Sequence, residues 1–129
     1  MKSKLTMTEC IHSDSYHNDQ GSPQPPLYDT SLFAFESTQA MRDVMVGKTP
    51  GAFYSRYGMN PTITALEGKL AQLDNAEASL AFSSGMAAIY ALFMHFSTQG
   101  ILCVGDVYGG TQQLLSKQLP ALGIKTFSL

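Results

Sequence analysis

The chain has 129 residues, of which 44% are hydrophobic and 14% are charged, and its formal net charge is −2. This length allows one core, and the composition is that of an ordinary globular protein. Because the charge is near neutral and no stretch concentrates Lys or Arg, nucleic-acid partners are not expected. The longest apolar runs fall short of the ~20 residues of a membrane-spanning helix, so no membrane partner is expected either.

The two cysteines, Cys10 and Cys103, lie far apart in unrelated contexts. Unpaired thiols are typical of a reducing compartment, and the first residues lack the apolar segment of a secretory signal. The sequence therefore predicts a cytoplasmic location. Cys10, His12 and His17 lack a fourth ligand in a polar segment, so no metal site is predicted.

Residues 1–26 are polar and end in the letters PQPP, which predicts a flexible N-terminal arm, extended or disordered. Residues 27–60 form a second section with an extended segment, a short helix and a loop. Ser37 is the expected cap of that helix, which should end at about Val46, before Gly47. The loop that follows, AFYSRYGMNP, has three aromatic residues and no helical period.

Residues 61–129 have the pattern of an α/β domain. A helix should begin at Asn60 or Thr62, because apolar residues then recur every three or four positions. After it, short apolar runs alternate with helical patterns: strands are predicted at 78–82, 101–104 and 124–129, and helices at 85–96 and 111–119. This alternation predicts a partial, mostly parallel sheet with flanking helices. Because the sequence stops inside the last apolar run, we expect a truncated domain.

The segment Ser83-Ser84-Gly85-Met86 falls where a predicted strand meets a predicted helix. Free N–H groups at a helix N-terminus bind anions, and a glycine there lets a phosphate approach the backbone. The alternative is an ordinary serine cap, which the tetrapeptide by itself favours.

Two further loops carry residues suited to ligand binding. In Tyr54-Ser55-Arg56-Tyr57 the guanidinium suits a phosphate or a carboxylate, and the alternative is an exposed arginine stacked on Tyr57. Val107-Tyr108-Gly109-Gly110-Thr111 follows a predicted strand, and the Tyr108 ring could stack on an aromatic ligand. By itself this second segment could be only a turn.

Taken together, the segments YSRYGMNPT, LAFSSGMAAI and DVYGGT resemble the Cys/Met metabolism enzymes that depend on pyridoxal 5'-phosphate (PLP). That family includes cystathionine γ-synthase, cystathionine β- and γ-lyases, methionine γ-lyase and O-acylhomoserine sulfhydrylases. The resemblance runs from about Pro26 to Leu129. It implies the front portion of the large domain of a PLP-dependent transferase (aspartate aminotransferase-like, fold type I) and transsulfuration chemistry on small amino-acid substrates.

The resemblance also implies roles for single residues. Tyr54 and Arg56 would bind the cofactor phosphate in the active site of a neighbouring subunit. Tyr108 would stack on the pyridine ring and take part in catalysis beside the substrate. The active unit would accordingly be a homodimer or a homotetramer.

The phosphate cup of the chain's own site would be formed by Ser84, Gly85 and Met86, chiefly through the N–H groups of the last two. The family's Schiff-base lysine, the aspartate of the pyridine nitrogen and the arginine of the substrate carboxylate lie downstream and have no counterpart in this sequence. We therefore expect the chain alone to be inactive.

The connection TQGI before the second strand is about two residues shorter than the family pattern. Two alternatives to an enzyme portion remain open at this point. One is a non-catalytic binding or interaction module that associates with a full-length partner. The other is a truncated product without stable function, with an exposed sheet edge that favours aggregation.

Overall fold

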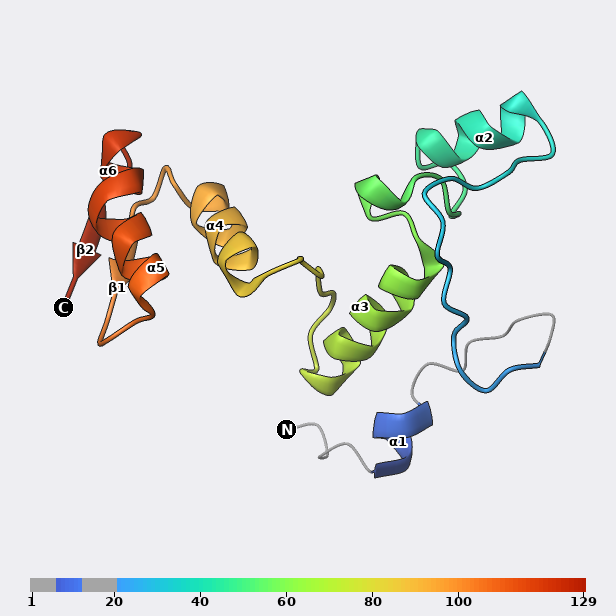
Figure 1. Ribbon diagram of the computed structural model, residues 1–129, viewed down its shortest axis with the longest axis horizontal. Coiled ribbons are helices and arrows are strands. Elements are labelled where there is room, and N and C mark those ends of the chain that lie inside the picture. Colours follow the sequence, from blue (N-terminus) through green and yellow to red (C-terminus); the bar gives the residue numbers. More distant parts are fainter. Residues whose placement is uncertain (1–6, 13–20) are drawn as a thin grey trace. The chain divides into compact units, whose positions relative to one another are not determined.

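A computed structural model describes residues 7–12 and 21–129, and the chain divides into two compact units, Met1–Ala81 and Phe82–Leu129 (Figure 1). The side chains of Cys10, His12 and His17, where no metal site is predicted, lie outside the described part. Among the described residues, no helix has both the length and the apolar character needed to cross a bilayer.

The first unit contains three α-helices among its described residues. They are α1 (Met7–His12), α2 (Thr38–Met45) and α3 (Pro61–Leu73), and a 3-10 turn covers Ser55–Tyr57. Part of the segment predicted to be extended is thus the six-residue helix α1. The other described residues of that segment, 21–26, contain no helix or strand.

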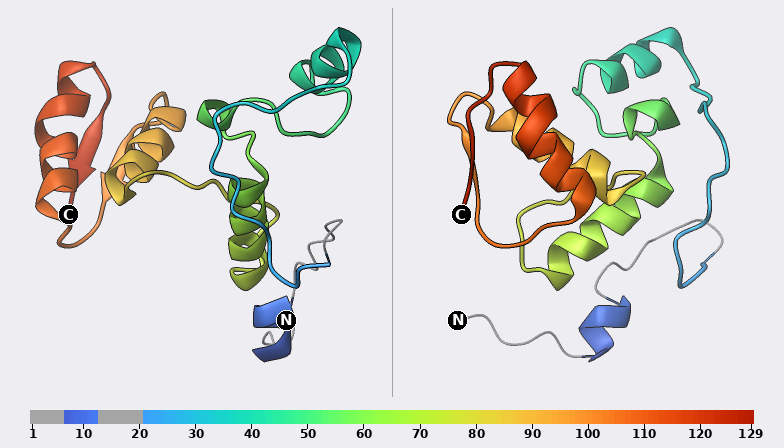
Figure 2. Two further views of the ribbon diagram at one scale, coloured as in Figure 1. Left: turned by 45° about the vertical axis from the view of Figure 1, so that its right-hand side comes forward. Right: turned by 60° about the vertical axis from the view of Figure 1, so that its left-hand side comes forward.

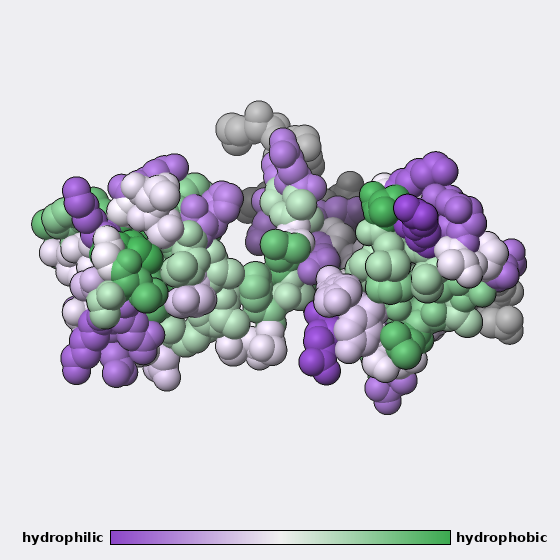
Figure 3. Space-filling view, turned by 90° about the horizontal axis from the view of Figure 1, so that it is seen from above, coloured by the Kyte–Doolittle hydropathy of each residue, from purple (hydrophilic) through white to green (hydrophobic). Residues whose placement is uncertain are grey.

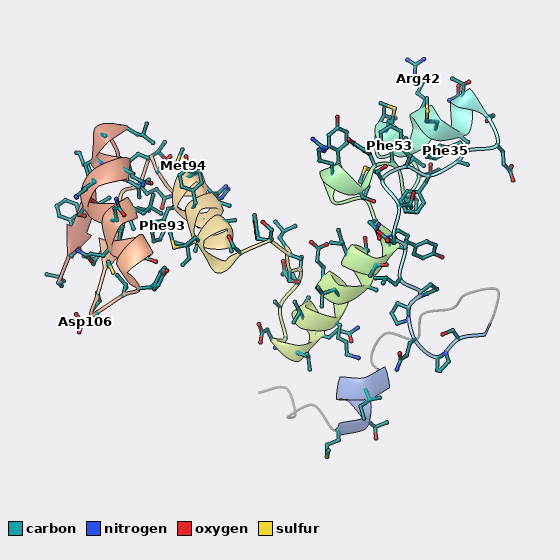
Figure 4. All side chains as sticks on the ribbon, viewed as in Figure 1. Phe35, Arg42, Phe53, Phe93, Met94 and Asp106 are labelled. Atoms are coloured by element: carbon teal, nitrogen blue, oxygen red, sulfur yellow. The ribbon has the colours of Figure 1, made fainter. Side chains whose placement is uncertain are left out.

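The prediction for α2 is confirmed. The Ser37 hydroxyl accepts a hydrogen bond from the Ala40 N–H at 3.1 Å, and Val46 is the C-terminal cap. Val44 is buried, and Phe35 lies beside Phe53 with ring centroids 6.0 Å apart, whereas Arg42 projects away from the helix (Figure 4). Local capping and a small apolar contact therefore hold this segment.

The N-cap of α3 is Asn60, not the alternative Thr62. The Asn60 carboxamide oxygen accepts a hydrogen bond from the Thr62 N–H at 2.9 Å, and Pro61 occupies the first helical position. The apolar stripe of this helix is largely uncovered, because Leu66 and Leu70 are 51% and 41% exposed and Ala71 is its one described buried residue. Capping and periodicity define this helix more than packing does.

The second unit is an α/β layer (Figure 2). It contains α4 (Gly85–His95), β1 (Ile101–Cys103) and β2 (Thr126–Ser128), and a helical run between the strands. That run consists of α5 (Gly109–Gln113), a π-helical segment (Leu114–Gln118) and α6 (Leu119–Ala121). The helix predicted at 111–119 is confirmed, and it begins two residues earlier.

The two strands pair in parallel, with Ile101 opposite Thr126 and Leu102 opposite Phe127. The core of this unit lies between the sheet and the helices, and Phe93 of α4 points into it (Figure 4). Its buried residues are Ile101, Leu114, Leu115 and Leu119. The short connection before β1 is closed by turns that end at Gly100, whose φ is 81°.

The prediction of a strand at 78–82 is wrong. This segment has no regular secondary structure, and Leu80 is 76% exposed. A strand needs a neighbour for its N–H and C=O groups, and no described segment pairs with this one. The Ser79 hydroxyl instead donates to the Glu67 carbonyl at 2.7 Å, and the Ala81 N–H donates to the Glu67 carboxylate at 2.8 Å. The described sheet consequently has two strands, not three.

Candidate functional site

The N-terminus of α4 has a cap and two free donors. The Ser84 hydroxyl accepts from the Ala87 N–H at 3.2 Å, and the Ser84 carbonyl accepts from the Ala88 N–H at 3.2 Å. The alternative of a serine cap is therefore correct for Ser84. It leaves the Gly85 and Met86 N–H groups without a hydrogen-bond partner among the described residues.

The space in front of these donors is open. A Cβ added at Gly85 would have no heavy atom within 4 Å, and Gly85 itself is exposed. Free N–H groups and the positive end of the helix dipole favour an anion at this position. The serine cap and the anion site are thus compatible, because they use different donors.

Tyr108 lies in the same unit, at the start of α5. The residue is 74% exposed. A Cβ added at Gly110 would lie 2.9 Å from the Tyr108 Cε1 atom and 3.3 Å from the Met86 sulfur, so both side chains border Gly110. The Thr111 hydroxyl, which is buried, donates to the Met86 sulfur at 3.5 Å. The structure therefore brings Tyr108 close to the residue that carries one of the two free donors.

The other two predicted site residues, Tyr54 and Arg56, belong to the first unit. The Arg56 guanidinium carbon lies 5.9 Å from the centroid of the Tyr54 ring, within the range of a cation–π contact. The Tyr54 and Tyr57 rings meet edge to face at 5.0 Å. Arg56 thus stacks on Tyr54 and not on Tyr57, and it forms no ion pair with a described acidic residue. Its guanidinium is exposed and available for a ligand.

The loop that carries Tyr54 and Arg56 is held by Ser55 and Asn60. The Ser55 N–H donates to the Ser31 carbonyl at 3.0 Å, and its hydroxyl donates to the Thr30 carbonyl. The Asn60 amide donates to the Ser55 hydroxyl at 2.9 Å and to the Tyr28 carbonyl at 3.0 Å. The sequence predicts Asn60 only as a helix cap and Ser55 has no predicted role, because the bonds of this loop to Thr30 and Tyr28 join residues 25 and 32 positions apart and leave no local signal.

Comparison with known proteins supplies the chemical context of these residues. The model of the family "Cys/Met metabolism PLP-dependent enzyme" matches residues 7–129. An L-methionine gamma-lyase from Pseudomonas deceptionensis is 39% identical over 108 residues, which cover 82% of this chain and 27% of that protein. A cystathionine gamma-lyase from Bacillus subtilis is 38% identical over 128 residues, which cover 98% of this chain and 31% of the relative.

A solved structure agrees with the sequence relatives. The structure of metY from Campylobacter jejuni contains N'-pyridoxyl-lysine-5'-monophosphate, and it matches with a TM-score of 0.83 and 28% identity. The match covers 95% of this chain and 30% of that one. The chain thus spans less than a third of the length of these relatives. The structural neighbours have PLP-dependent fold type I, so the predicted fold class is confirmed.

The residues in the second unit fit two parts of pyridoxal phosphate. The free Gly85 and Met86 donors suit an anionic phosphate, and the open space at Gly85 admits it. The exposed Tyr108 ring suits a planar heteroaromatic ring. The chain therefore carries donors for the phosphate and a flat apolar surface for the ring within one unit.

Proposed function

The chain belongs to the Cys/Met metabolism PLP-dependent enzymes, and from this premise we propose that it is the phosphate-binding part of a transsulfuration enzyme. The intact protein would catalyse elimination or replacement on a small amino acid that contains sulfur or an activated homoserine oxygen. Such reactions belong to the metabolism of cystathionine, methionine and homocysteine. Pyridoxal phosphate, when bound, supplies an electron sink for the charge that develops on the substrate.

One observation carries this proposal. Two adjacent N–H donors, those of Gly85 and Met86, have no partner among the described residues at the start of an eleven-residue helix. The Tyr108 ring and the Met86 side chain both border Gly110. A helix N-terminus alone would suit any small anion. An exposed aromatic ring in the same unit favours a ligand with both an anionic group and a flat ring.

Each of the chain's residues has a limited task in this proposal. Gly85 and Met86 would donate to the phosphate, and Ser84 would hold the helix start in place. Tyr108 would lie against the pyridine ring and near the reacting bonds.

Tyr54 and Arg56 would contact the phosphate held by a second copy of the chain, which makes the active unit a homodimer or a homotetramer. Arg56 is exposed and forms no ion pair with an acidic residue of the described part of the chain, which supports this role. The residues that activate the cofactor covalently and bind the substrate carboxylate are supplied from outside these 129 residues, so the chain alone would bind the cofactor without turnover.

We also place the protein in the cytoplasm. Cys103 is a free, half-buried thiol on β1, which suits a reducing compartment.

The phosphate role of Gly85 can be tested by substitution with aspartate. A carboxylate at this position stabilises the helix start, and the Cβ has room, but the negative charge repels a phosphate. We expect Gly85→Asp to weaken binding of pyridoxal phosphate to the full chain by on the order of tenfold, which corresponds to about 1.4 kcal/mol. Binding is measured by equilibrium dialysis with absorbance detection of the cofactor.

Gly85→Asn is the matched control, because it has the same shape as the aspartate variant and no charge. It should bind within about threefold of the unmodified chain, since a threefold change is less than 1 kcal/mol. Pyridoxal without its phosphate should bind more weakly than pyridoxal phosphate, and its affinity should not differ between the two variants. Equal affinity of the unmodified chain for both compounds would refute the proposed phosphate site.

A further inference from the structure

We propose that Gly110 and Met86 are positioning residues that form a seat for the Tyr108 ring. The absent side chain of Gly110 and the thioether of Met86 determine where the ring lies relative to the free donors of α4. The meaning of this seat for cofactor binding rests on the function proposed above, but the seat itself is a property of the ligand-free chain.

The geometry around Gly110 is close enough to depend on the missing Cβ. The position of that atom lies 2.9 Å from Tyr108 Cε1, 3.3 Å from Tyr108 Cδ1 and 3.3 Å from the Met86 sulfur. Real Cβ atoms essentially never approach another heavy atom within 3.0 Å. The ring occupies its observed place only because residue 110 is a glycine.

Few other contacts hold this ring. It is 74% exposed, and its phenol oxygen forms no hydrogen bond to a described residue. Its main-chain position is set by the helix start, where Tyr108 precedes α5 without a side-chain cap bond. The space left by the missing Cβ of Gly110 is therefore a large share of what allows the ring its observed orientation.

Met86 is held by two contacts of its own. Its sulfur accepts a hydrogen bond from the Thr111 hydroxyl at 3.5 Å, and Thr111 is 5% exposed. Met86 also packs against the buried core cluster of the unit. A thioether is normally flexible, so this bond and this packing restrict a side chain that would otherwise move.

The consequence is a direct link between the two halves of the proposed site. The backbone N–H of Met86 is one of the free donors, and its side chain borders the seat of the ring. A phosphate bound at the Met86 N–H and the Tyr108 ring would thus be positioned relative to each other by atoms of the same residue, Met86. A change at Gly110 should move the ring and leave the donors in place.

The neighbouring glycine offers a matched control. A Cβ added at Gly109 would have no heavy atom within 4 Å, in contrast to Gly110. Both positions lie in α5, and neither has a positive φ. Alanine has a higher helix propensity than glycine, so both substitutions favour the local helix and differ only in what the new methyl group meets.

The experiment compares Gly110→Ala with Gly109→Ala in the full chain. Nuclear magnetic resonance of chain with 13C-labelled tyrosine reports the chemical shifts of the Tyr108 ring and its Overhauser contacts with residues 86 and 110. We expect these signals to be retained in Gly109→Ala. In Gly110→Ala the ring shifts should move toward those of free tyrosine and the contact with residue 86 should be lost.

A second measurement separates this inference from the proposed function. Gly110→Ala should weaken pyridoxal phosphate binding about fivefold, which is about 1 kcal/mol, and should retain the preference over pyridoxal, because the donors of α4 are unchanged. If neither the unmodified chain nor any variant binds the cofactor, the proposed function fails. The resonance experiment still tests whether Gly110 positions the Tyr108 ring, because it needs no cofactor. An unmoved Tyr108 ring in Gly110→Ala would overturn the seat.

Met86→Leu provides a second route if Gly110→Ala lowers the helix content seen by circular dichroism. Leucine keeps a similar volume and the backbone N–H but has no sulfur to accept the Thr111 hydroxyl. The Tyr108 signals should move in this variant too. Unchanged Tyr108 signals in Met86→Leu would count against the seat just as they would in Gly110→Ala.

Discussion

At the scale of single residues, the buried Asn60 side chain makes hydrogen bonds to three other residues of the first unit. It is 5% exposed, it caps α3, and its amide donates to Tyr28 and Ser55. Sequence reasoning predicted the cap, because Asn before Pro at a helix start is a local signal. The two donated bonds reach 32 and 5 residues away, and only the folded chain shows them.

Asn60→Ala should therefore cost more than an ordinary cap. It removes the cap bond, worth about 1 kcal/mol, and leaves the Tyr28 carbonyl without its amide donor, which adds about 1 kcal/mol more. We expect the free energy of unfolding in urea to fall by about 2 kcal/mol. The Arg56 loop should also become more accessible to protease.

Ser37→Ala is the control for this prediction. Ser37 caps α2 through one exposed bond to the Ala40 N–H, so its loss should cost about 1 kcal/mol and leave the loop at Arg56 unchanged. An Asn60→Ala effect no larger than that of Ser37→Ala would show that the two donated bonds add nothing to stability.

At the scale of elements, the helical run between β1 and β2 departs from regular geometry for a local reason. In a regular α-helix the Leu119 N–H would bond to Leu115, but here it bonds to the Leu114 carbonyl. Pro120 has no N–H to offer. The Leu115 carbonyl accepts instead from the Thr126 hydroxyl of β2 at 2.8 Å. The π-helical segment thus leaves the Leu115 carbonyl free to accept the hydrogen bond that connects β2 to the helical run.

Thr126→Val tests this connection. The valine keeps the shape and the strand propensity of threonine but leaves the buried Leu115 carbonyl unsatisfied, since Leu115 is 1% exposed. We expect a loss of about 1–3 kcal/mol in unfolding free energy, measured by urea titration with circular dichroism.

Two variants show whether the hydroxyl is responsible. Thr126→Ser retains the donor and should cost less than Thr126→Val. In a Pro120→Ala background the restored N–H gives the helix another way to satisfy its carbonyls, so Thr126→Val should cost at least about 0.5 kcal/mol less there, a coupling typical of residues that share a partner. Equal costs in both backgrounds would contradict the role assigned to Pro120.

The strand predicted at 78–82 did not form, because this segment has no strand partner among the described residues. Its short apolar run, bounded by polar residues, looked like a buried strand in the sequence, as did those of β1 and β2, although it has no β-branched residue. β1 and β2 pair in parallel, whereas the segment at 78–82 pairs with no described segment. Strand formation depends on a partner distant in sequence, which periodicity cannot supply.

At the scale of the whole molecule, the chain exposes much apolar surface. One face of the sheet packs on the helices through Ile101, while the opposite face presents Leu102 and Phe127, each 60% exposed. Figure 3 shows hydrophobic residues (green) that reach the surface in several places. Large apolar side chains exposed side by side, as Leu102 and Phe127 are on the sheet, mark an interaction site or an aggregation liability.

The double substitution Leu102→Thr with Phe127→Thr should reduce that liability. The two residues are register partners on one sheet face, and threonine retains strand propensity. We expect lower binding of a hydrophobic dye and less self-association in sedimentation velocity, with unfolding free energy changed by less than about 0.5 kcal/mol.

Leu27→Thr is the control, since Leu27 is 83% exposed but lies outside the sheet. It should leave dye binding and sedimentation unchanged. Unchanged dye binding in the double variant would show that the apolar surface that binds the dye lies elsewhere in the chain.

The sequence by itself predicts α2, α3, α4, the helical run between the strands, the apolar runs that become β1 and β2, and the family, because each depends on residues close together in the chain or on short motifs. It does not predict α1, which lies in the segment expected to be extended or disordered. It also predicts six site residues, which stay predictions; of these, Gly85 and Tyr108 are exposed, and the Gly85 and Met86 N–H groups have no partner among the described residues. Only the tertiary structure decided which apolar runs pair as strands, that Asn60 supports the Arg56 loop, and that Gly110 borders both Tyr108 and Met86. Those features depend on contacts between segments brought together by folding, and neither composition nor periodicity encodes a distance between atoms far apart in the chain.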